Sequence, residues 1–240
     1  MPGLDDLPTV TLLMPCLNEA KTVGHCVAIG LQALHELGIA GEVLVADNGS
    51  ADGSTLLAEQ AGARVSHVAP RGYGAALRAG IAAARGEFIV MGDCDLSYDF
   101  SAASLKPYID ALHDGADLVM GNRFKGGIAA GAMPMLHRLG TPVMTWIVNR
   151  MFGTAIGDIH CGLRAFRKQA VLRLGLQSDG MEFASEIFIR AVLAKLVIRE
   201  VPTTLSPDRR GRKPHLRIFR DSARHTWMWM QLYAGEKTRG

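Results

Sequence analysis

The chain has 240 residues, of which 48% are hydrophobic and 20% are charged, and its formal net charge is +3. A chain of this length can bury one large core, and the absence of low-complexity segments argues against an intrinsically disordered protein. We therefore expect one domain over residues 1–240. The charge is uneven, because residues 199–240 hold ten Lys/Arg and four Asp/Glu, a net +6, which leaves −3 for the rest.

Short runs rich in β-branched residues alternate with helix-like stretches over the first half of the chain. This alternation predicts an α/β fold with a mostly parallel central sheet and helices on both faces. After residue 123 the alternation stops, and a Gly/Ala/Met loop leads to a helix-like stretch, a turn over 153–166 and a helix near 182–196. The expected strands are 9–15, 41–47, 63–68, 87–93 and 116–122, and the expected helices are 19–37, 54–61, 74–84 and 101–113.

Ligands of such sheets bind beyond the carboxyl ends of the strands. The residues with the most informative chemistry collect at these ends, and Asp47 at the tip of the second strand is placed to contact a ligand. The loop after Asp47 resembles a calcium loop, but Gly49 and Ala51 occupy ligand positions, which argues against calcium.

The stretch around Gly72 and Gly74 raises the alternative of a dinucleotide fingerprint, with Asp93 about 20 residues further on. Leu77 replaces the third glycine, so a nicotinamide site is the weaker interpretation. The small residues of this stretch favour close packing of a helix on the sheet. Arg71 and the amides of the turn are candidates to face a phosphate.

Asp93 and Asp95 follow a buried strand at positions i and i+2, so both carboxylates are expected to share one cavity. Like charges this close repel unless a cation lies between them. Carboxylate oxygens suit Mg²⁺ or Mn²⁺, which predicts a metal site formed by these two residues. Asp99 follows closely in the same stretch.

A series of cationic side chains needs an anionic partner, and arginine binds phosphate through a two-pronged hydrogen-bonding group. A basic region near a metal site suits a diphosphate or a second phosphate. No basic module with interleaved aromatics is present, so we expect no nucleic-acid partner. These cations are Arg123, Lys125, Arg138, Arg164, Arg209, Arg210, Arg212 and Lys213.

The C-terminal segment has the pattern of an amphipathic helix with arginines on much of its polar surface. Such a helix either packs on the domain or lies on a membrane surface, and the pattern leaves both open. No uncharged apolar run approaches the roughly 20 residues that span a bilayer. The apolar positions at helical spacing are Leu216, Phe219, Ala223, Trp227 and Met230.

Seven motifs in order along the chain carry a resemblance to a known family. They are "MPCLNEAKTVG", "DNGSADGST", "RGYGAALRAGIAAARGEFIVMGDCDLSYDF", "GNRFKGG", "GDIHCGLRAFRK", "GMEFASEI" and "VPTTLSPDRRGRKPH". With them, the sequence resembles family 2 inverting glycosyltransferases of the GT-A fold, in the branch of dolichol- or polyprenyl-phosphate mannosyl- and glucosyltransferases. The likeness covers nearly the whole chain, with residues 205–240 as a basic loop followed by the amphipathic helix.

The resemblance implies a donor site at the carboxyl ends of the first strands. Asp95 would hold the metal on the donor diphosphate, and Asp93 would help to bind the nucleotide. Two residues depart from the common pattern, because Leu17 replaces an aromatic residue and Ser97 replaces a glutamine. The base and ribose would be lined by Pro15, Leu17, Asn18, Glu19 and Asp47.

For the acceptor side, the resemblance implies that Arg123 and Arg138 hold a phosphate. Arg209, Arg212 and Lys213 would belong to a basic loop that closes on the phosphates.

The implied reaction moves a hexose from a donor of the UDP-glucose or GDP-mannose type to polyprenyl or dolichyl phosphate, with inversion. A phosphate acceptor is already an anion and needs no general base, whereas the alternative, a soluble hydroxyl acceptor, does. Candidates for that base are Asp158, Glu182 and above all Glu186.

Two other functional classes stay open. A nucleotidyltransferase would release pyrophosphate, and a non-catalytic subunit would bind the donor without turnover. Four cysteines without a C-x-x-C pair, and no charged-then-apolar leader, favour a cytoplasmic protein. We expect it to be peripheral on the membrane.

Overall fold

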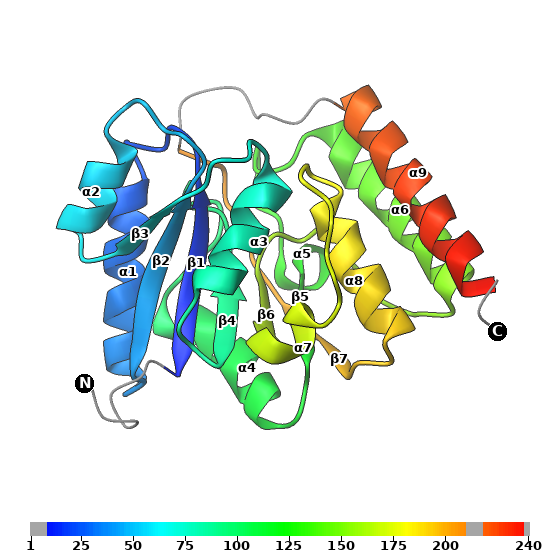
Figure 1. Cartoon of the computed structure of the whole chain (residues 1–240), viewed down its shortest axis with the longest axis horizontal. Coiled ribbons are helices and arrows are strands. Elements are labelled where there is room, and N and C mark those ends of the chain that lie inside the picture. Colours follow the sequence, from blue (N-terminus) through cyan, green and yellow to red (C-terminus); the bar gives the residue numbers. More distant parts are fainter. Residues whose placement is uncertain (1–8, 210–217, 238–240) are drawn as a thin grey trace.

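The computed structural model describes residues 9–209 and 218–237, with side chains for 9–209 and 224–234. Its elements follow one another in a largely alternating order, which places strands in one layer between two layers of helices (Figure 1). The elements are β1 (Val10–Cys16), α1 (Val23–Glu36), β2 (Gly41–Asp47), α2 (Ser54–Gln60), β3 (Arg64–His67), α3 (Tyr73–Ala83), β4 (Phe88–Met91), α4 (Ala102–His113), β5 (Leu118–Asn122), α5 (Arg123–Gly126), α6 (Met135–Phe152), β6 (Arg164–Arg167), α7 (Lys168–Leu172), α8 (Phe183–Leu193), β7 (Ile198–Pro202) and α9 (Ile218–Lys237).

The sheet of the described chain has seven strands in the order β3-β2-β1-β4-β6-β5-β7. Strand β6 is antiparallel to both of its neighbours, β4 and β5, and the other pairings are parallel. The α/β fold with a mostly parallel sheet, which the sequence predicts, is therefore confirmed. The five strands and four helices expected before residue 123 all form, with ends that differ by a few residues.

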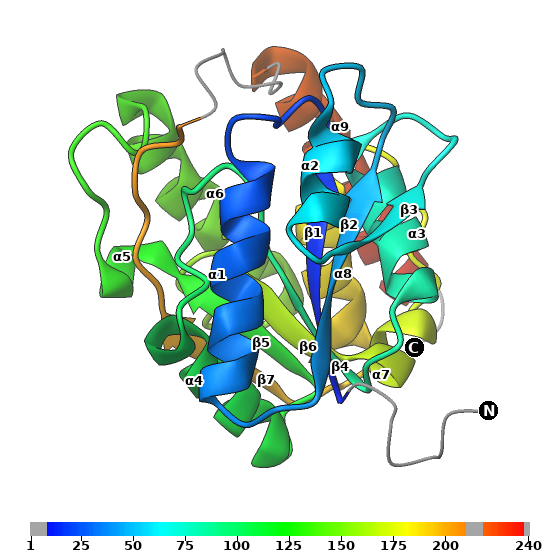
Figure 2. The same ribbon diagram turned by 90° about the vertical axis from the view of Figure 1, so that its left-hand side faces the viewer.

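Alternating side chains of each strand fill two cores, one on each face of the sheet. Leu12 and Met14 of β1 join the core beneath α1 and α4, whereas Leu13 joins the core beneath α3 and α8. Figure 2 shows α1 on one side of the sheet and α3 on the other. Strands buried on both faces explain the continuous apolar runs that identified them in the sequence.

Two strands were not predicted. Strand β6 overlaps the end of the stretch that we expected to form a turn, and β7 follows a stretch expected to be helical. Charged residues interrupt both: Arg164 and Arg167 bound β6, and Arg199 and Glu200 lie within β7. Arg164 is nevertheless fully buried, because its guanidinium donates to the carbonyl oxygens of Ile159 and Cys161 at 2.8 Å each, and to that of Ala184. Hydrogen bonds from a buried arginine to backbone carbonyl groups cannot be predicted from a hydropathy pattern.

The reversed direction of β6 decides what lies at the carboxyl edge of the sheet. Because β6 runs antiparallel, its amino end meets the carboxyl ends of β4 and β5 at this edge. The turn at residues 157–163, which precedes β6, therefore lies beside the residues that follow β4 and β5. The sheet brings together segments more than 60 residues apart in the chain.

The last helix packs on α8 and α6 at the side of the molecule away from β3 (Figure 1). Its buried residues include His225 and Trp229, whereas Trp227 and Met230 are exposed. Trp227 and Met230, the two members of the predicted apolar stripe whose side chains are described, thus face outward and do not pack on the domain. A different face docks, because Arg224 pairs with Glu182 and His225 Nδ1 lies 2.8 Å from Ser185 Oγ.

The close packing of α3 on the sheet depends on Gly80. A Cβ atom at this position would overlap Leu13 Cδ1 of β1 and lie 3.2 Å from Ala46 Cβ of β2. The expected close approach of this helix is thus seen, and it leaves no room for a larger side chain.

We expect Gly80→Val to destabilise the protein by about 2 kcal/mol or more, because overpacking forces the helix away from the sheet. The matched control is Ala82→Val on the exposed side of the same helix, which should cost less than about 1 kcal/mol through helix propensity alone. Urea unfolding of both variants measures the difference. Equal stabilities would show that the sheet tolerates the added volume.

Candidate functional site

A cavity of about 570 Å³ opens at the carboxyl edge of the sheet. It is bounded by the ends of β4 and β5, the turn before β6, and parts of α3, α6 and α9. Its lining contains both polar and apolar side chains. The polar lining includes Asp93, Asp95, Tyr73, Tyr98, Arg123, His160, Asp208 and His225, and the apolar lining includes Met91, Met133, Leu136, Met144 and Met181.

Asp93 and Asp95 line this cavity together, as the sequence predicts for a shared site. Strand β4 ends at Met91, so the two carboxylates are held by the turn after the strand rather than by the strand itself. Asp95 is almost fully buried, and its Oδ1 accepts hydrogen bonds from the N–H and hydroxyl of Ser97 at 2.9 and 2.5 Å. Leu96, which lies between Asp95 and Ser97, has φ of 66°, a left-handed conformation that is uncommon for leucine.

Asp99 takes no part in this pair. Its carboxylate accepts hydrogen bonds from Ser101 and Ser104 at the start of α4. These bonds hold the pKa of Asp99 below its ordinary value although burial alone would raise it. Of the three closely spaced aspartates, two face the cavity and the third caps a helix region.

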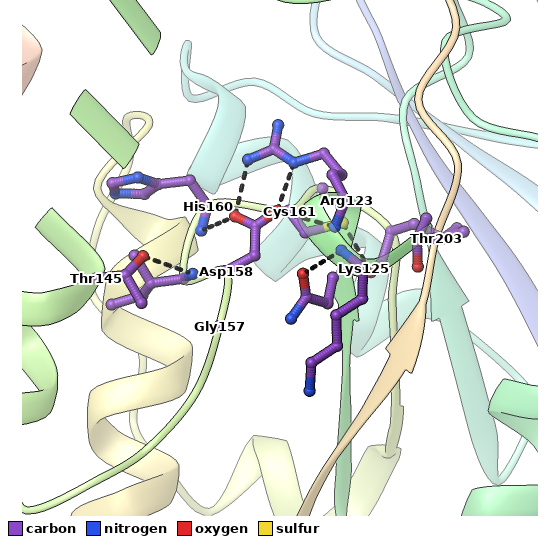
Figure 3. Close-up of polar contacts among 12 residues, drawn as sticks. Arg123, Lys125, Thr145, Gly157, Asp158, His160, Cys161 and Thr203 are labelled. Atoms are coloured by element: carbon purple, nitrogen blue, oxygen red, sulfur yellow. Dashed lines mark hydrogen bonds and ion pairs between the residues drawn. The ribbon is translucent and has the colours of Figure 1, made fainter. Parts of the chain in front are cut away.

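Arg123 and Asp158 form a buried ion pair at the cavity wall (Figure 3). The guanidinium Nε and Nη2 donate to Asp158 Oδ2 and Oδ1 at 2.6 and 2.9 Å, and the Arg123 backbone N–H donates to Oδ2 at 3.2 Å. Burial lowers the pKa of Arg123, but Tyr98 and Asp158 outweigh it and raise that pKa above its ordinary value. The arginine therefore stays charged and points in a fixed direction.

The turn from Asp158 to Gly162 forms one side of the site. The backbone N–H of His160 donates to Asp158 Oδ1 at 3.2 Å, and that of Gly162 donates to the Tyr98 hydroxyl at 2.8 Å. Burial, reinforced by His225 and Arg123, lowers the pKa of His160 well below its ordinary value. His160 is therefore neutral near pH 7 and adds no positive charge to the wall.

The predicted base and ribose residues form a second group of loops at the same edge. Asn18 lies in a left-handed conformation with φ of 57°, and its Oδ1 accepts from the Ala51 N–H at 2.8 Å, which joins the loops after β1 and β2. Asp47 is buried and accepts from the N–H groups of Gly49 and Ser50. The Arg71 guanidinium lies over Gly49.

The remaining members of this group are Pro15, Leu17 and Glu19. The Glu19 N–H donates to Ser54 Oγ at 2.8 Å, and the thiol of Cys94 donates to the Pro15 carbonyl at 3.3 Å. The second bond connects these loops directly to the residue between Asp93 and Asp95. The base and ribose roles stay predictions.

The segment after β7 returns along the carboxyl edge to the aspartates. The Ser206 N–H donates to the Ser97 carbonyl at 2.9 Å, and the Arg209 N–H donates to the Asp95 carbonyl at 3.0 Å. Arg209 therefore begins the basic segment beside Asp95. Arg212 and Lys213, predicted to belong to that segment, lie outside the described residues.

Two predicted catalytic residues lie apart from the cavity lining. Arg138 is exposed on α6, next to His137, which does line the cavity. Glu186 is buried in α8, where Arg190 Nε lies 2.7 Å from its Oε1 and the N–H groups of Gln177 and Ser178 donate to it. Neither role is tested by this geometry, and both stay predictions.

The carboxylates of Asp93 and Asp95 are ligands of the kind that a divalent metal ion prefers. Within residues 9–209 and the described part of α9, no three His, Cys, Asp or Glu side chains are grouped to hold a metal on their own. Mg²⁺ and similar ions commonly take one or two carboxylates and complete their shell with water and substrate phosphates. Asp93 and Asp95, at the wall of one cavity, satisfy that requirement.

Sequence patterns did not identify several residues that line the cavity. Tyr73, Tyr98, His160, His225 and Asp208 come from five different segments, and no spacing links them. Tyr98 carried a usable signal, since it lies three residues after Asp95. His225 carried none, because its contribution depends on how α9 docks.

The model of the family described as Glycosyl transferase family 2 matches residues 11–175. The chain is 38% identical over 223 residues to the low-salt glycan biosynthesis hexosyltransferase Agl6 of Haloferax volcanii, covering 92% of this chain and 53% of that protein. It thus spans about half the length of that relative. It is 29% identical over 198 residues to a dolichyl-phosphate hexose transferase of the same organism, with 82% of each chain covered.

Among solved structures, the fold is similar to glucosyl-3-phosphoglycerate synthase from Mycobacterium tuberculosis in complex with Mn²⁺, UDP-glucose and phosphoglyceric acid. The TM-score is 0.68 at 19% identity, and the match covers 95% of this chain and 79% of that one.

Asp158→Asn tests the buried ion pair. We expect it to destabilise the protein by about 3 kcal/mol, because it leaves the Arg123 charge buried without its partner. The control is Asp110→Asn, which breaks an exposed pair with Lys106 and should cost less than about 1 kcal/mol. Chemical denaturation measures both. A loss as small as that of the control would mean that the pair is not needed for the fold.

Proposed function

The chain belongs to glycosyl transferase family 2, with a GT-A fold, and from this premise we propose that it transfers a hexose to a polyprenyl or dolichyl phosphate. The donor would be a nucleotide sugar of the UDP-glucose or GDP-mannose type, and the anomeric carbon would be inverted. The likeness to a dolichyl-phosphate hexose transferase supports this acceptor class.

The observation that carries the proposal is the composition of the cavity. Its lining includes two carboxylates suited to a metal and a diphosphate, together with the fixed cation Arg123. The same lining is also rich in methionine, with Met133, Met144 and Met181. Methionine adapts to irregular apolar ligands. A molecule with a phosphate head and a hydrocarbon chain matches both kinds of lining residue.

The state of the candidate bases also favours a phosphate acceptor. Asp158 is paired with Arg123, Glu182 with Arg224 and Glu186 with Arg190, each within a salt bridge of the fold. A carboxylate held in such a pair is less free to approach the hydroxyl of an acceptor. An anionic phosphate acceptor needs no general base.

The proposed reaction uses these residues for binding and orientation. An acceptor phosphate oxygen would attack the anomeric carbon opposite the diphosphate, whose C–O bond breaks with its electron pair leaving on the nucleoside diphosphate. Arg123, held by Asp158, would orient the acceptor phosphate and compensate its charge. Arg138 and the basic segment from Arg209 to Lys213 would add positive charge at the phosphates, as the family resemblance implies.

Asp93 and Asp95 would hold Mg²⁺ or Mn²⁺, which supplies charge neutralisation at the departing diphosphate when bound. The loops with Asn18, Asp47 and Arg71 would bind the nucleotide beside them. This arrangement positions both substrates at the same edge of the sheet.

The outer face of α6 supports a peripheral association with membranes. Leu136, Leu139, Val143 and Trp146 recur at helical spacing, and each is 57–65% exposed. Residues 124–157 hold Lys125, Arg138 and Arg150 but no Asp or Glu. An apolar stripe flanked by cations suits the surface of an anionic bilayer. The exposed Trp227 and Met230 of the neighbouring α9 add to the same apolar character.

No helix among the described residues has the length and apolar character needed to cross a membrane. The proposed association is with the membrane surface, and it would place the cavity near a lipid acceptor. Leu136 lies on α6 and also lines the cavity, so the two features adjoin.

Release of nucleoside diphosphate tests the proposed reaction. The protein is supplied with Mn²⁺ and, one at a time, UDP-glucose, UDP-galactose, UDP-N-acetylglucosamine or GDP-mannose. Each donor is tested with polyprenyl phosphate, with unphosphorylated polyprenol and without lipid. We expect release with one donor and only with the phosphorylated lipid. Equal release with polyprenol, or without lipid, would contradict a phosphate acceptor.

In the same assay, Asp208→Asn distinguishes a phosphate acceptor from the alternative, a soluble hydroxyl acceptor. Asp208 is exposed and lines the cavity, so it is a further candidate for the base that a hydroxyl acceptor needs. With a phosphate acceptor the variant should keep its rate within about threefold, whereas an enzyme that needs this base would lose about 10²–10⁴. Asp95→Ala, which removes a proposed metal ligand, should abolish release in either case.

Membrane association is tested with Leu139→Glu. We expect binding to vesicles containing phosphatidylglycerol to fall about tenfold, because the variant loses apolar contact and adds a negative charge on the docking face. Leu56→Glu is the matched control, since Leu56 is similarly exposed on the distant helix α2. Co-sedimentation measures both variants, and equal losses would argue against α6 as the docking face.

A further inference from the structure

Asp158 fixes the direction of Arg123, but it lies in a segment without regular structure. Residues 154–163 form neither helix nor strand, so a ladder of backbone hydrogen bonds does not hold the Asp158 backbone in place. A carboxylate gives a guanidinium a constant direction only if the carboxylate is itself fixed. The side chains that hold the neighbours of Asp158 are therefore part of how the site is built.

Glu200 of β7 lies beside the Arg123–Asp158 pair without belonging to it. Its Oε1 accepts a hydrogen bond from the Gly157 N–H at 2.7 Å and another from Asn122 Nδ2 at 3.1 Å. Asn122 immediately precedes Arg123, and Gly157 immediately precedes Asp158. One carboxylate oxygen thus joins the two segments that carry the ion pair.

The two segments are in close contact at this point. A Cβ atom at Gly157 would overlap Asn122 Nδ2 and would lie 3.3 Å from Glu200 Oε1. The Asn122 side chain is almost fully buried, and its Oδ1 accepts from the Lys125 N–H at 3.0 Å. Both ends of this amide are therefore hydrogen-bonded, as a buried polar group requires.

The second oxygen of Glu200 has a different surrounding. Its Oε2 lies 3.5 Å from Nζ of Lys125, which is exposed. Exposed ion pairs contribute little to stability. The two hydrogen bonds that join the segments both end on Oε1, so a glutamine at this position could keep them.

Helix α6 holds the same turn from another side. Asn149 Oδ1 accepts from the Ile156 N–H at 3.1 Å, and Asn149 Nδ2 donates to the Ile156 carbonyl at 2.8 Å. One helical turn earlier, Thr145 Oγ1 accepts from the Ile159 N–H at 3.3 Å (Figure 3). The backbone before and after Asp158 is thus bonded by side chains of α6 as well as of β7.

We propose that Glu200 and Asn149 are positioning residues of the acceptor site. By holding the backbone before Asp158, they keep its carboxylate where it directs the Arg123 guanidinium toward the acceptor phosphate. Neither residue lines the cavity, so both act through the ion pair rather than on the phosphate. A guanidinium fixed before its ligand arrives loses less conformational entropy on binding. The inference rests on the proposed function, in which Arg123 binds the acceptor phosphate.

The test is binding of geranyl phosphate, a short isoprenyl phosphate, measured by isothermal titration calorimetry without a donor. We expect Glu200→Ala to weaken binding about tenfold, since a displaced Arg123 loses a hydrogen bond to a charged group. Glu200→Gln should bind within about twofold of the wild type, because Oε1 remains and only the exposed contact with Lys125 changes. A loss in Glu200→Gln equal to that in Glu200→Ala would contradict the proposal.

Asn149→Ala is the second variant, because it releases the turn from α6 instead of from β7. It should weaken geranyl phosphate binding in the same direction as Glu200→Ala. Circular dichroism checks that each variant is folded. If Glu200→Ala does not fold, Asn149→Ala decides, and wild-type binding by Asn149→Ala would then overturn the proposal.

The matched control is Glu42→Ala at the amino end of β2, on the edge of the sheet opposite the cavity. The Glu42 side chain is 13% exposed, against 17% for Glu200, and its Oε1 accepts from the Arg85 N–H at 2.9 Å. The variant should lose stability in urea unfolding but bind geranyl phosphate as the wild type does. Equal losses of binding in Glu42→Ala and Glu200→Ala would show that reduced stability alone explains the effect.

Arg123→Lys separates this inference from the proposed function. It keeps the charge but not the two-pronged group, and it should weaken geranyl phosphate binding at least as much as Glu200→Ala. If Arg123→Lys binds weakly while Glu200→Ala and Asn149→Ala bind normally, the positioning role is wrong and the acceptor site stands. If Arg123→Lys binds normally, or the wild type does not bind geranyl phosphate, both assignments are overturned.

Discussion

The buried pair of Arg123 and Asp158 is the interaction on which the site depends. Arg123 follows β5, whereas Asp158 precedes β6, so the pair ties two segments together at the carboxyl edge of the sheet. A guanidinium at a cavity wall is useful for binding phosphate only when its direction is fixed and its burial compensated. Asp158 supplies both, so this carboxylate serves to hold Arg123 rather than to act as a base.

The antiparallel strand β6 makes this arrangement possible. A parallel strand in its place would bring its carboxyl end to this edge, whereas β6 brings its amino end and the turn before it. That turn contacts Arg123 through Asp158 and Asp93 through Gly162. One reversal in the sheet thus places cationic and anionic groups at the same cavity. Donor and acceptor subsites in our proposal share this turn, so changes in it should affect both.

The sequence allowed much of the fold to be predicted, because strands such as β1 and β4 are buried on both faces and read as apolar runs. It also indicated Asp93 and Asp95, whose close spacing after such a run is unusual. It could not show β6, since Arg164 is buried through backbone carbonyls rather than apolar packing. Nor could it show that Asp158 binds Arg123, or that Tyr73 and His225 reach the cavity, because these contacts arise only from tertiary packing.

The most direct test of the account is a crystal structure with Mn²⁺, the nucleoside diphosphate of the preferred donor and a short-chain polyprenyl phosphate. The account predicts Mn²⁺ on Asp93 and Asp95, the acceptor phosphate on Arg123 and the hydrocarbon chain along Met133 and Met144. A nucleotide bound away from the two aspartates, or an acceptor phosphate that does not contact Arg123, would contradict it.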